Sequence, residues 1–493
     1  MTMKTIKSIS ILIIASFLLT ACEDWLDVKP KTEVESSELL KTESGYKDAL
    51  WGVYTKMTET SMYGLNMTVT PDAMAKMYSR IGSSSALNHF SSYNYTSTRT
   101  QPVVDAVWQN TYTTIANLNN LITNIQSADK GMFARDNYNV IYGEALGLRA
   151  FLHFDLLRLF APSYADDPDA AAIPYVVAFD NHITETSTVS KTIEFILKDL
   201  NAAAALLKES DPMVTKRTVT TSEDNGYLLN RNLRFNYYAI VATMARVYLY
   251  KGDKINATLK AQEVIDGSGC QWTSVDNIAT TEANRDHTFT PEQVFVLKVE
   301  KMENNIQYAL SLDARWISGN SVSLSLSDAN QIYPYSTDWR GWGTLYGWSS
   351  VLSLSGTYRM PTKLWQYEDM PATYKCLLPL IRMPEMKLIV AECNPSGKGA
   401  EIINEIRTHR GITDIFPADA KEGEVMAEIR NEYQREFYCE GVLWYYYKRL
   451  NNPTIPYYSY GRQNNQNMDR EKYVWPMPKE EIEFGNRNSK TKA

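Results

Sequence analysis

The sequence is poor in the residue types that most metal and nucleophile centres use. Only five cysteines and five histidines occur among its 493 residues. No His-Glu-x-x-His motif and no close histidine pair is present, which argues against a zinc site. The chain also lacks a Gly-x-Ser-x-Gly motif and a glycine-rich phosphate loop ending in Gly-Lys-Ser/Thr. We therefore expect a protein that is not an enzyme and that holds neither a metal nor a cofactor.

An excess of positive charge is also missing. The chain has 50 basic and 57 acidic side chains, for a formal net charge of −7. Binding to nucleic acid needs a basic surface that releases counterions from phosphate. The charge balance therefore predicts that nucleic acid is not a partner.

No stretch of the sequence is apolar enough to span a bilayer. The most apolar run, residues 9–19, is shorter than the roughly 20 residues that a membrane helix needs. It follows the basic residues Lys4 and Lys7 and precedes Leu19-Thr20-Ala21-Cys22. This order of charge, short apolar core and small residues is that of a secretory signal peptide, which we assign to residues 1–21.

Cys22 stands where such a leader is cut, and Leu19-Thr20-Ala21-Cys22 resembles a bacterial lipobox, in which the cysteine is acylated. A lipid on Cys22 would hold the protein at a membrane without spanning it. Glu23 and Asp24 follow directly, a pattern that favours display on the outer surface of the cell. The spacing of Cys270, Cys376, Cys393 and Cys439 leaves their disulfide state open.

Helical periodicity dominates the first half of the chain. Apolar residues recur at spacings of three and four along 141–159 and 193–207, which predicts two strongly buried helices. Residues 235–267 predict a helix, a tight turn at Gly252-Asp253 and a second helix, similar to one tetratricopeptide unit. Residues 103–160 supply a weaker candidate pair. Because such pairs bury their faces by stacking, one unit implies neighbours.

From 268 to 378 the periodicity gives way to a short strand candidate, residues 292–300, and then to Gly, Ser, Asn and aromatic residues. High aromatic content argues against disorder, so a long irregular segment of this kind is typical of a functional region. Helices are expected to resume near Arg382 and to end with one long helix over 428–450. That helix carries Glu428, Glu432, Glu436 and Glu440 on one face, which we interpret as structural support held by nearby cations. The local candidates are Arg430, Arg435, Lys448 and Arg449.

Several motifs, in order along nearly the whole chain, resemble the SusD/RagB family of outer-membrane nutrient-binding lipoproteins. They are CEDWLDVKP (22–30), EALGLRAFLHFDLLRLFAPSY (144–164), IPYV (173–176), EQVFVLKVE (292–300), LIRMPEMKLIVAE (380–392), NEIRTHRGI (404–412), NEYQREFYCEG (431–441) with YYYKRL (445–450), and YVWPMPKEEIEFGN (473–486). The run VLWYYY (442–447) is unusually aromatic for this pattern and leaves the subfamily open.

The resemblance implies a mainly α fold: a right-handed tetratricopeptide-like helical scaffold and a loop-rich portion with a little β structure. It implies one SusD-like domain over 22–493, with a helical scaffold over 35–267, a ligand-binding segment over 268–378 and a C-terminal helical region over 379–493. Members of the family bind oligosaccharides, or in some cases peptides, and cover a SusC-like TonB-dependent transporter. We therefore expect an outer-membrane protein, anchored through Cys22 on the surface of a Gram-negative bacterium.

The stretch DWRGWGTLYGW, residues 338–348, is the first candidate for the ligand site. Sugar rings expose patches of C–H that lie flat on indole and phenol rings, which lose little entropy when fixed. The predicted contacts are Asp338, Trp339, Arg340, Trp342, Tyr346 and Trp348. The alternative is that these aromatics pack the loop onto the helices, and we expect the set to divide between the two roles.

Two further regions are candidates. The loop over 79–99 supplies Arg80, Asn88, Tyr93 and Tyr95, and a weaker candidate is YYSYGR, residues 457–462. Two alternatives to glycan binding stay open. Aromatic loops also serve peptides, and a glycoside hydrolase would need only two facing carboxylates in an aromatic cleft.

Overall fold

The architecture is taken from a computed structural model that describes residues 38–83, 85–307, 322–341, 347–353, 356–485 and 487. Cys22, Trp342 and Tyr346 lie outside the described residues, and so do the assigned signal peptide and its cleavage boundary.

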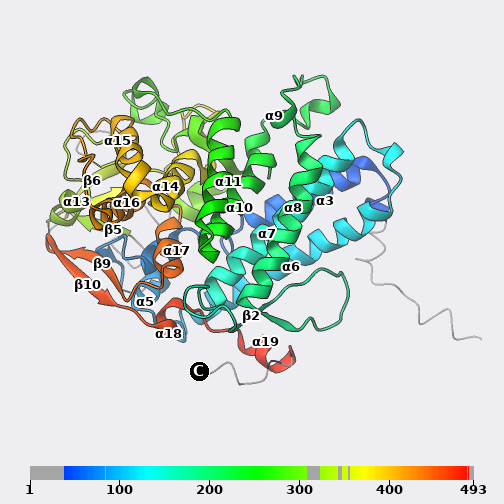
Figure 1. Ribbon diagram of the computed structural model, residues 1–493, viewed down its shortest axis with the longest axis horizontal. Coiled ribbons are helices and arrows are strands. Elements are labelled where there is room, and N and C mark those ends of the chain that lie inside the picture. Colours follow the sequence, from blue (N-terminus) through cyan, green and yellow to red (C-terminus); the bar gives the residue numbers. More distant parts are fainter. Residues whose placement is uncertain are drawn as a thin grey trace, which may run out of the picture.

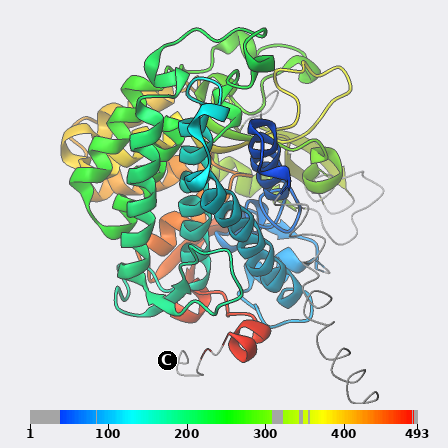
Figure 2. The ribbon, with the colours of Figure 1, turned by 90° about the vertical axis from the view of Figure 1, so that its right-hand side faces the viewer.

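A stack of helices forms one half of the molecule (Figures 1 and 2). It consists of α3 (Glu43–Met57), α6 (Gln101–Ser127), α7 (Asn137–Phe160), α8 (Val189–Lys208), α10 (Tyr237–Lys251), α11 (Lys254–Gly267) and α14 (Met383–Cys393), which pack in that order, with α7 between α6 and α8. Nearly every side chain of α7 is buried, because helices cover it on both sides. The predicted helices over 141–159 and 193–207 are thus confirmed.

The predicted tetratricopeptide-like pair over 235–267 is confirmed as α10 and α11. Gly252 ends α10 in the left-handed conformation, with a φ of 82°, and Asp253 caps α11 by accepting a hydrogen bond from the Asn256 N–H. Ala245, Ala257 and Ala261 are fully buried where the helices meet. The expected mainly α class with tetratricopeptide-like pairs therefore describes the fold.

Most of the short strands lie in the other half of the molecule; the exception is the strand pair over 171–188, which packs against α7 and α8. One antiparallel sheet consists of β1 (Arg80–Ile81), β5 (Val322–Ser325), β7 (Gly356–Pro361) and β6 (Trp348–Ser353), in that spatial order. The predicted strand over 292–300 is β4 (Gln293–Lys298), which pairs with β8 (Leu377–Arg382). Two hairpins complete the set: β2 (Ala171–Pro174) with β3 (Thr186–Thr188), and β9 (Thr454–Ser459) with β10 (Arg462–Asn467).

Further helices connect these parts. They are α4 (Val69–Met74), α5 (Ala86–Ser91), α9 (Pro212–Thr215), α13 (Leu326–Ile332), α15 (Ala400–Thr408), α16 (Glu422–Glu436), α17 (Val442–Arg449), α18 (Arg470–Tyr473) and α19 (Lys479–Phe484). Helix α4 packs on α5 and α17, so the segment just before the predicted N-terminal loop rests on the C-terminal part of the chain.

The prediction of one long helix over 428–450 is wrong. Helix α16 ends at Glu436 and α17 begins at Val442, since Cys439 and Gly441 adopt left-handed backbone with φ of 64° and 73°. The buried Asp72 carboxylate accepts hydrogen bonds from the N–H groups of Cys439 and Gly441 and so holds the break. Glu440 consequently lies in this turn and not on a continuous helical face.

His153 is a satisfied core residue, as expected from its position in an apolar helix. Its Nδ1 lies 2.8 Å from the Arg149 carbonyl oxygen, and its Nε2 accepts a hydrogen bond from the Val176 N–H. Burial lowers the pKa of His153 to about 3, so the ring is neutral. The four cysteines beyond Cys22 are free thiols.

Candidate ligand-binding site

Asp338 and Arg340, two of the predicted ligand contacts, belong to the protein interior. The Arg340 side chain is fully buried; it donates to the Asp338 carboxylate, to Glu432 at 2.7 Å and to Glu436 at 3.1 Å. Neither charged group has surface left to offer a ligand. We therefore remove Asp338 and Arg340 from the candidate set, because their charges serve to hold the segment onto α16.

The glutamate stripe is structural support, as interpreted, and both Glu432 and Glu436 are fully buried. Burial by itself would raise the pKa of Glu436, but the guanidinium groups of Arg410, Arg382 and Arg340 hold it well below the usual carboxyl range. Glu432 and Glu436 form the centre of what we call the core network, whose other members are Glu292, Asp338, Arg340, Lys363, Arg382, Arg410, Arg435 and Glu440.

Of the four cations expected to balance the stripe, only Arg435 does so, through Glu428 and Glu432. Arg449 pairs with Glu392 on α14, and Lys448 donates to the carbonyl oxygens of Leu159 and Tyr473. Arg430 donates to the side chain of Gln434. Most of the balancing charge thus comes from segments far away in the sequence.

The structure describes two of the four aromatic residues of this stretch, Trp339 and Trp348. Trp348 is buried, with 6% of its surface exposed, between the rings of Tyr333 and Tyr438, and its indole N–H donates to the Tyr333 hydroxyl. It is a core residue, so its prediction as a ligand contact is corrected. Trp339 is half-buried beside Gly411 and keeps some surface. The prediction for Trp342 and Tyr346 concerns residues outside the described part of the chain.

Arg80 from the predicted N-terminal loop is exposed and lies over an aromatic ring that the sequence did not single out. Its guanidinium carbon is 4.3 Å from the ring centre of Tyr358. The sheet explains the meeting: β5 pairs on one side with β1, where Arg80 faces Ser323, and on the other with β7, where Tyr358 faces Ser325. Tyr358 is buried, with 7% of its surface exposed, so the exposed guanidinium of Arg80 is the group of this pair that a ligand can reach, and the phenol supports it from beneath.

Tyr93, from the same loop, meets the third candidate region. The Lys76 ammonium lies 5.0 Å from the ring centre of Tyr93 and 5.9 Å from that of Tyr457 on β9. Tyr93 has a φ of 59°, which is costly for a bulky residue, and its hydroxyl donates to the Met74 carbonyl oxygen. Burial lowers the pKa of Lys76 to about 8.

The other two predicted residues of the loop have different positions. Asn88 is half-buried, with its amide 3.5 Å from the Ile81 carbonyl oxygen. Tyr95 is buried against Phe90 and Trp475, and its hydroxyl donates to the Lys472 carbonyl oxygen. Tyr95 is therefore corrected to a core residue.

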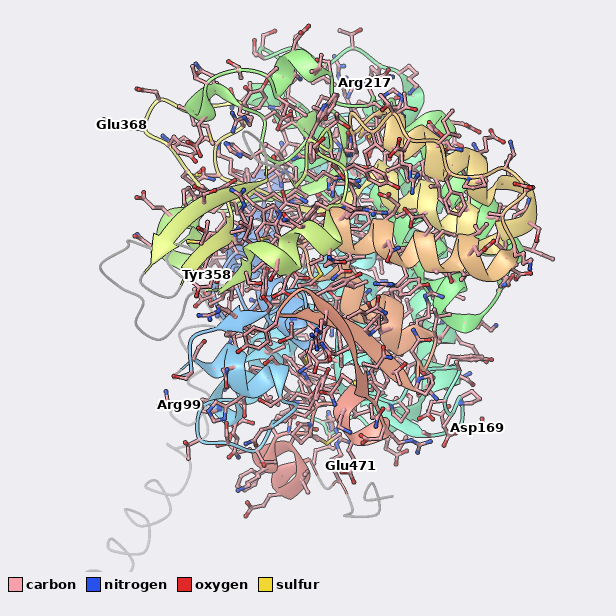
Figure 3. All side chains as sticks on the ribbon, turned by 90° about the vertical axis from the view of Figure 1, so that its left-hand side faces the viewer. Arg99, Asp169, Arg217, Tyr358, Glu368 and Glu471 are labelled. Atoms are coloured by element: carbon pink, nitrogen blue, oxygen red, sulfur yellow. The ribbon has the colours of Figure 1, made fainter. Side chains whose placement is uncertain are left out.

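We define the binding face as Lys76, Arg80, Tyr93, Tyr358 and Tyr457. Figure 3 looks onto this side of the molecule, with Tyr358 labelled and the β9–β10 hairpin running across the front. Sequence reasoning missed Lys76 and Tyr358. Tyr358 carries no distinguishing signal in the sequence, because its partner Arg80 reaches it only through the intervening strand β5.

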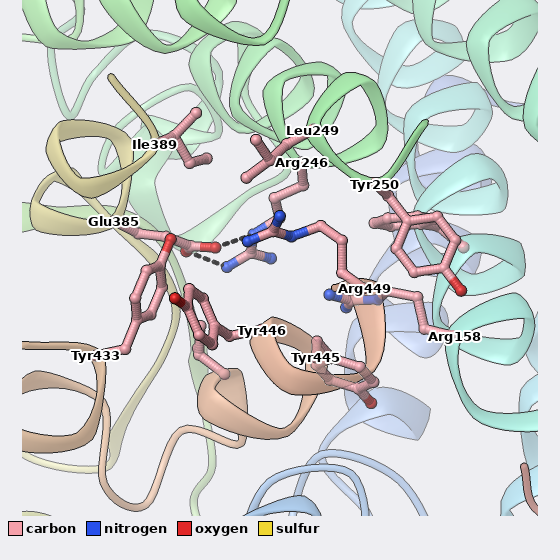
Figure 4. Close-up of a pocket in the computed structure, with 12 residues that line it drawn as sticks. Arg158, Arg246, Leu249, Tyr250, Glu385, Ile389, Tyr433, Tyr445, Tyr446 and Arg449 are labelled. Carbon is pink, nitrogen blue, oxygen red and sulfur yellow. Dashed lines mark hydrogen bonds and ion pairs between the residues drawn. The ribbon is translucent and has the colours of Figure 1, made fainter. Parts of the chain in front are cut away.

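A cavity among α7, α10, α14, α16 and α17 is too small for a sugar. It has a volume of about 40 Å³ and is lined by Arg158, Arg246, Arg449, Glu385 and four tyrosines among others (Figure 4). A neighbouring cavity of about 30 Å³ shares several of these residues. Small-molecule pockets measure several hundred Å³, whereas these hold a few waters. Neither of these two cavities is therefore a candidate site for a sugar.

Two family models match the sequence. The model described as "Starch-binding associating with outer membrane" matches residues 24–249, and the model described as "SusD family" matches residues 328–489. The chain belongs to the SusD/RagB family. The two matches cover both the helical stack and the C-terminal part, and the binding face takes residues from each.

Solved structures of SusD-like proteins share the fold. A SusD superfamily protein from Bacteroides thetaiotaomicron has 20% identity and a TM-score of 0.71, over 90% of this chain and 98% of that one. A SusD superfamily protein from Bacteroides vulgatus has 20% identity and a TM-score of 0.67, over 90% and 98%. A SusD-like carbohydrate binding protein from Bacteroides vulgatus has 17% identity and a TM-score of 0.65, over 91% and 98%.

No curated protein gave a significant match to the sequence. Among the helices of the described ranges, none combines the length and apolar character that a membrane crossing requires.

Proposed function

We propose that this SusD-like protein is a non-enzymatic, lipid-anchored receptor at the cell surface. It captures oligosaccharides and passes them to a SusC-like TonB-dependent transporter in the outer membrane. Cys22 carries the lipid, and no cofactor takes part. Residues 22–493 form one domain. The family model described as starch-binding and outer-membrane-associated supports this proposal, as does the carbohydrate-binding neighbour from Bacteroides vulgatus.

One observation carries the proposal: three distant segments bring cations and phenol rings together on one face. Arg80 lies over Tyr358, and Lys76 lies between Tyr93 and Tyr457. Phenol rings accept the C–H faces of sugars, while ammonium and guanidinium groups donate hydrogen bonds to sugar hydroxyls. Such a combination suits the hydroxyl groups and C–H faces of an oligosaccharide.

The same face supports binding over hydrolysis. A glycoside hydrolase places two carboxyl groups on either side of the bond it cuts, about 5 to 9.5 Å apart. The five residues of the binding face include no carboxylate. Glu432 and Glu436, two of the periodic glutamates, are fully buried in ion pairs. Their carboxylates therefore have no access to a sugar.

Calorimetric titration of the soluble protein, lacking residues 1–22, against plant, microbial and host oligosaccharides and mixed peptides tests the proposal. The variants are Tyr358→Ala and Arg80→Ala, with Trp342→Ala to test the predicted contact in 338–348. Phe484→Ala is the matched control, because Phe484 is an exposed aromatic on α19 at 72% exposure. We expect at least one oligosaccharide to bind the parent and the control, and to lose about tenfold or more in affinity with Arg80→Ala; Tyr358→Ala, at a buried position, tests the support of Arg80 and is compared only if its melting temperature is unchanged.

The outcomes separate the alternatives. Heat from peptides alone would replace glycan by peptide as the ligand, and release of shorter sugars would establish hydrolysis. Sugar binding that survives Tyr358→Ala and Arg80→Ala but fails with Trp342→Ala would move the site to the 338–348 stretch.

A further inference from the structure

The turn between β9 and β10 contains a residue that local backbone preference disfavours. Tyr460 and Gly461 form a two-residue hairpin turn in which both have positive φ, 54° and 73°. This geometry strongly prefers Asn-Gly or Asp-Gly, since a bulky side chain at positive φ is strained. Tyrosine at the first position therefore costs conformational free energy that asparagine would largely avoid.

Packing does not offset that cost. Tyr460 is 87% exposed, so its ring contributes almost no buried surface. The turn itself is firmly placed, because the Gly461 N–H donates to Asp328 Oδ1 at 2.7 Å. A strained residue with a solvent-exposed ring on an anchored turn is a feature that clusters at functional sites.

The outer face of the same hairpin presents amide groups. In the β9–β10 register, Gln463 lies opposite Tyr458, Asn465 opposite Pro456 and Asn467 opposite Thr454, so these pairs share a face. The other face is turned inward, since Ile455 is fully buried. The side chains of Asn465 and Asn467 are exposed and make no hydrogen bond within the described residues.

We propose that Tyr458, Tyr460, Gln463, Asn465 and Asn467, the hairpin platform, form a second carbohydrate-binding surface that takes the part of a glycan extending beyond the binding face. Amides both donate and accept hydrogen bonds, which suits sugar hydroxyls, and the two phenol rings can stack on sugar C–H faces. None of the five side chains is charged at neutral pH.

The platform is continuous with the binding face. Gly461, next to Tyr460, lies against Ser327, just after β5, and β5 pairs with the strands that carry Arg80 and Tyr358. On the inward side of the hairpin, Tyr457 lies near Lys76. A chain held by Arg80 can therefore continue onto Tyr460, whose ring is exposed. The inference rests on the proposed function and adds a dependence on ligand length.

The decisive variant is Tyr460→Asn, because a structural role and a binding role predict opposite results. Asparagine suits the turn, so the melting temperature should stay the same or rise. The probe is an array of plant, microbial and host oligosaccharides, each immobilised at several chain lengths. For a glycan that binds the parent, we expect Tyr460→Asn to lose about tenfold in affinity for the longest chains and to leave the shortest ones unchanged.

Asn465→Ala with Asn467→Ala should reproduce the length-dependent loss, while Phe484→Ala should not. Equal binding of all lengths by Tyr460→Asn and by the amide variant would overturn the inference and leave the proposed function standing. Loss of transporter association without loss of glycan binding would also overturn it, in favour of a protein-docking role. If no glycan binds the parent, the proposed function itself fails, and this inference fails with it.

Discussion

Two arginines, Arg340 and Arg80, show how burial decides the role of one side chain. Both stand in stretches rich in aromatic residues. Arg340 is fully buried against three carboxylates, whereas Arg80 is exposed over the Tyr358 ring and makes no ion pair within the described residues. The first guanidinium is committed to the fold, and the second remains available. Their substitutions should therefore separate stability from binding.

The largest effect is expected from Arg340→Met. Removing this cation leaves Asp338, Glu432 and Glu436 with fewer partners in a dry interior, which costs about 3–5 kcal/mol of unfolding free energy. Arg80→Ala should cost less than about 0.5 kcal/mol, because its surroundings are hydrated. Urea denaturation of both variants measures the difference. Similar losses for the two arginines would contradict the contrast.

Acid should weaken the core network and leave the binding face largely unaffected. The folded protein holds the pKa of Glu436 below its unfolded value, so the stabilisation is fully present above the ordinary carboxyl range and is lost as pH falls through and below it. Each pKa unit by which the fold lowers the pKa of Glu436 contributes about 1.4 kcal/mol to the free energy of unfolding. Urea denaturation between pH 7 and 3 should show a steeper loss for the parent than for Glu436→Gln. Parallel curves would show that Glu436 is not the source of the stability lost at low pH.

The contact between the turn that joins α16 to α17 and the segment around Thr68 can be tested at Gly441. A methyl group on Gly441 would lie 2.8 Å from the Thr68 carbonyl oxygen, and the residue has a φ of 73°. We expect Gly441→Ala to cost about 2–3 kcal/mol. Gly252→Ala is the control, since Gly252 has a φ of 82° but open space around it, and should cost only about 1 kcal/mol. Equal costs in thermal unfolding would show that the contact with Thr68 is unimportant.

The smallest effect concerns Lys76 on the binding face. Its pKa of about 8 means that the ammonium loses its proton just above neutral pH. If Lys76 donates to the ligand, affinity should fall by a few-fold between pH 7 and 9, as a charge-assisted hydrogen bond is lost. Lys76→Arg keeps its charge and should give a flat profile. A parent profile that is flat as well would show that Lys76 only supports Tyr93.

Local pattern predicted the parts of the fold whose partners are close in sequence. The spacing of apolar residues over 141–159 marks α7, and Gly252-Asp253 marks the turn between α10 and α11. The break at Gly441 was missed, because it depends on Asp72, a residue more than 360 positions away. The periodic glutamates suggested one helix, while a distant carboxylate stabilises the turn that interrupts it.

The candidate site shows the same limit. Arg340 and Glu432 are 92 positions apart, so no local signal marked Arg340 as an interior residue. Trp348 and Tyr95 looked like ligand contacts because the sequence shows their type and not their surroundings. Within the loop over 79–99, Arg80 is exposed and Tyr93 is half-buried. The contact of Arg80 with Tyr358 follows from strand pairing, while Tyr457, which reaches Lys76, belongs to the stretch 457–462 that the sequence had already singled out.

Asp72 also bears on how far this protein is modular. It lies in the segment matched by one family model, while Cys439 and Gly441, whose N–H groups it accepts, lie in the segment matched by the other. Each half, taken alone, would expose a buried carboxylate or two unpaired backbone donors. The two segments are therefore expected to be inherited together, and exchanging one of them between relatives should succeed only when this shared turn is preserved.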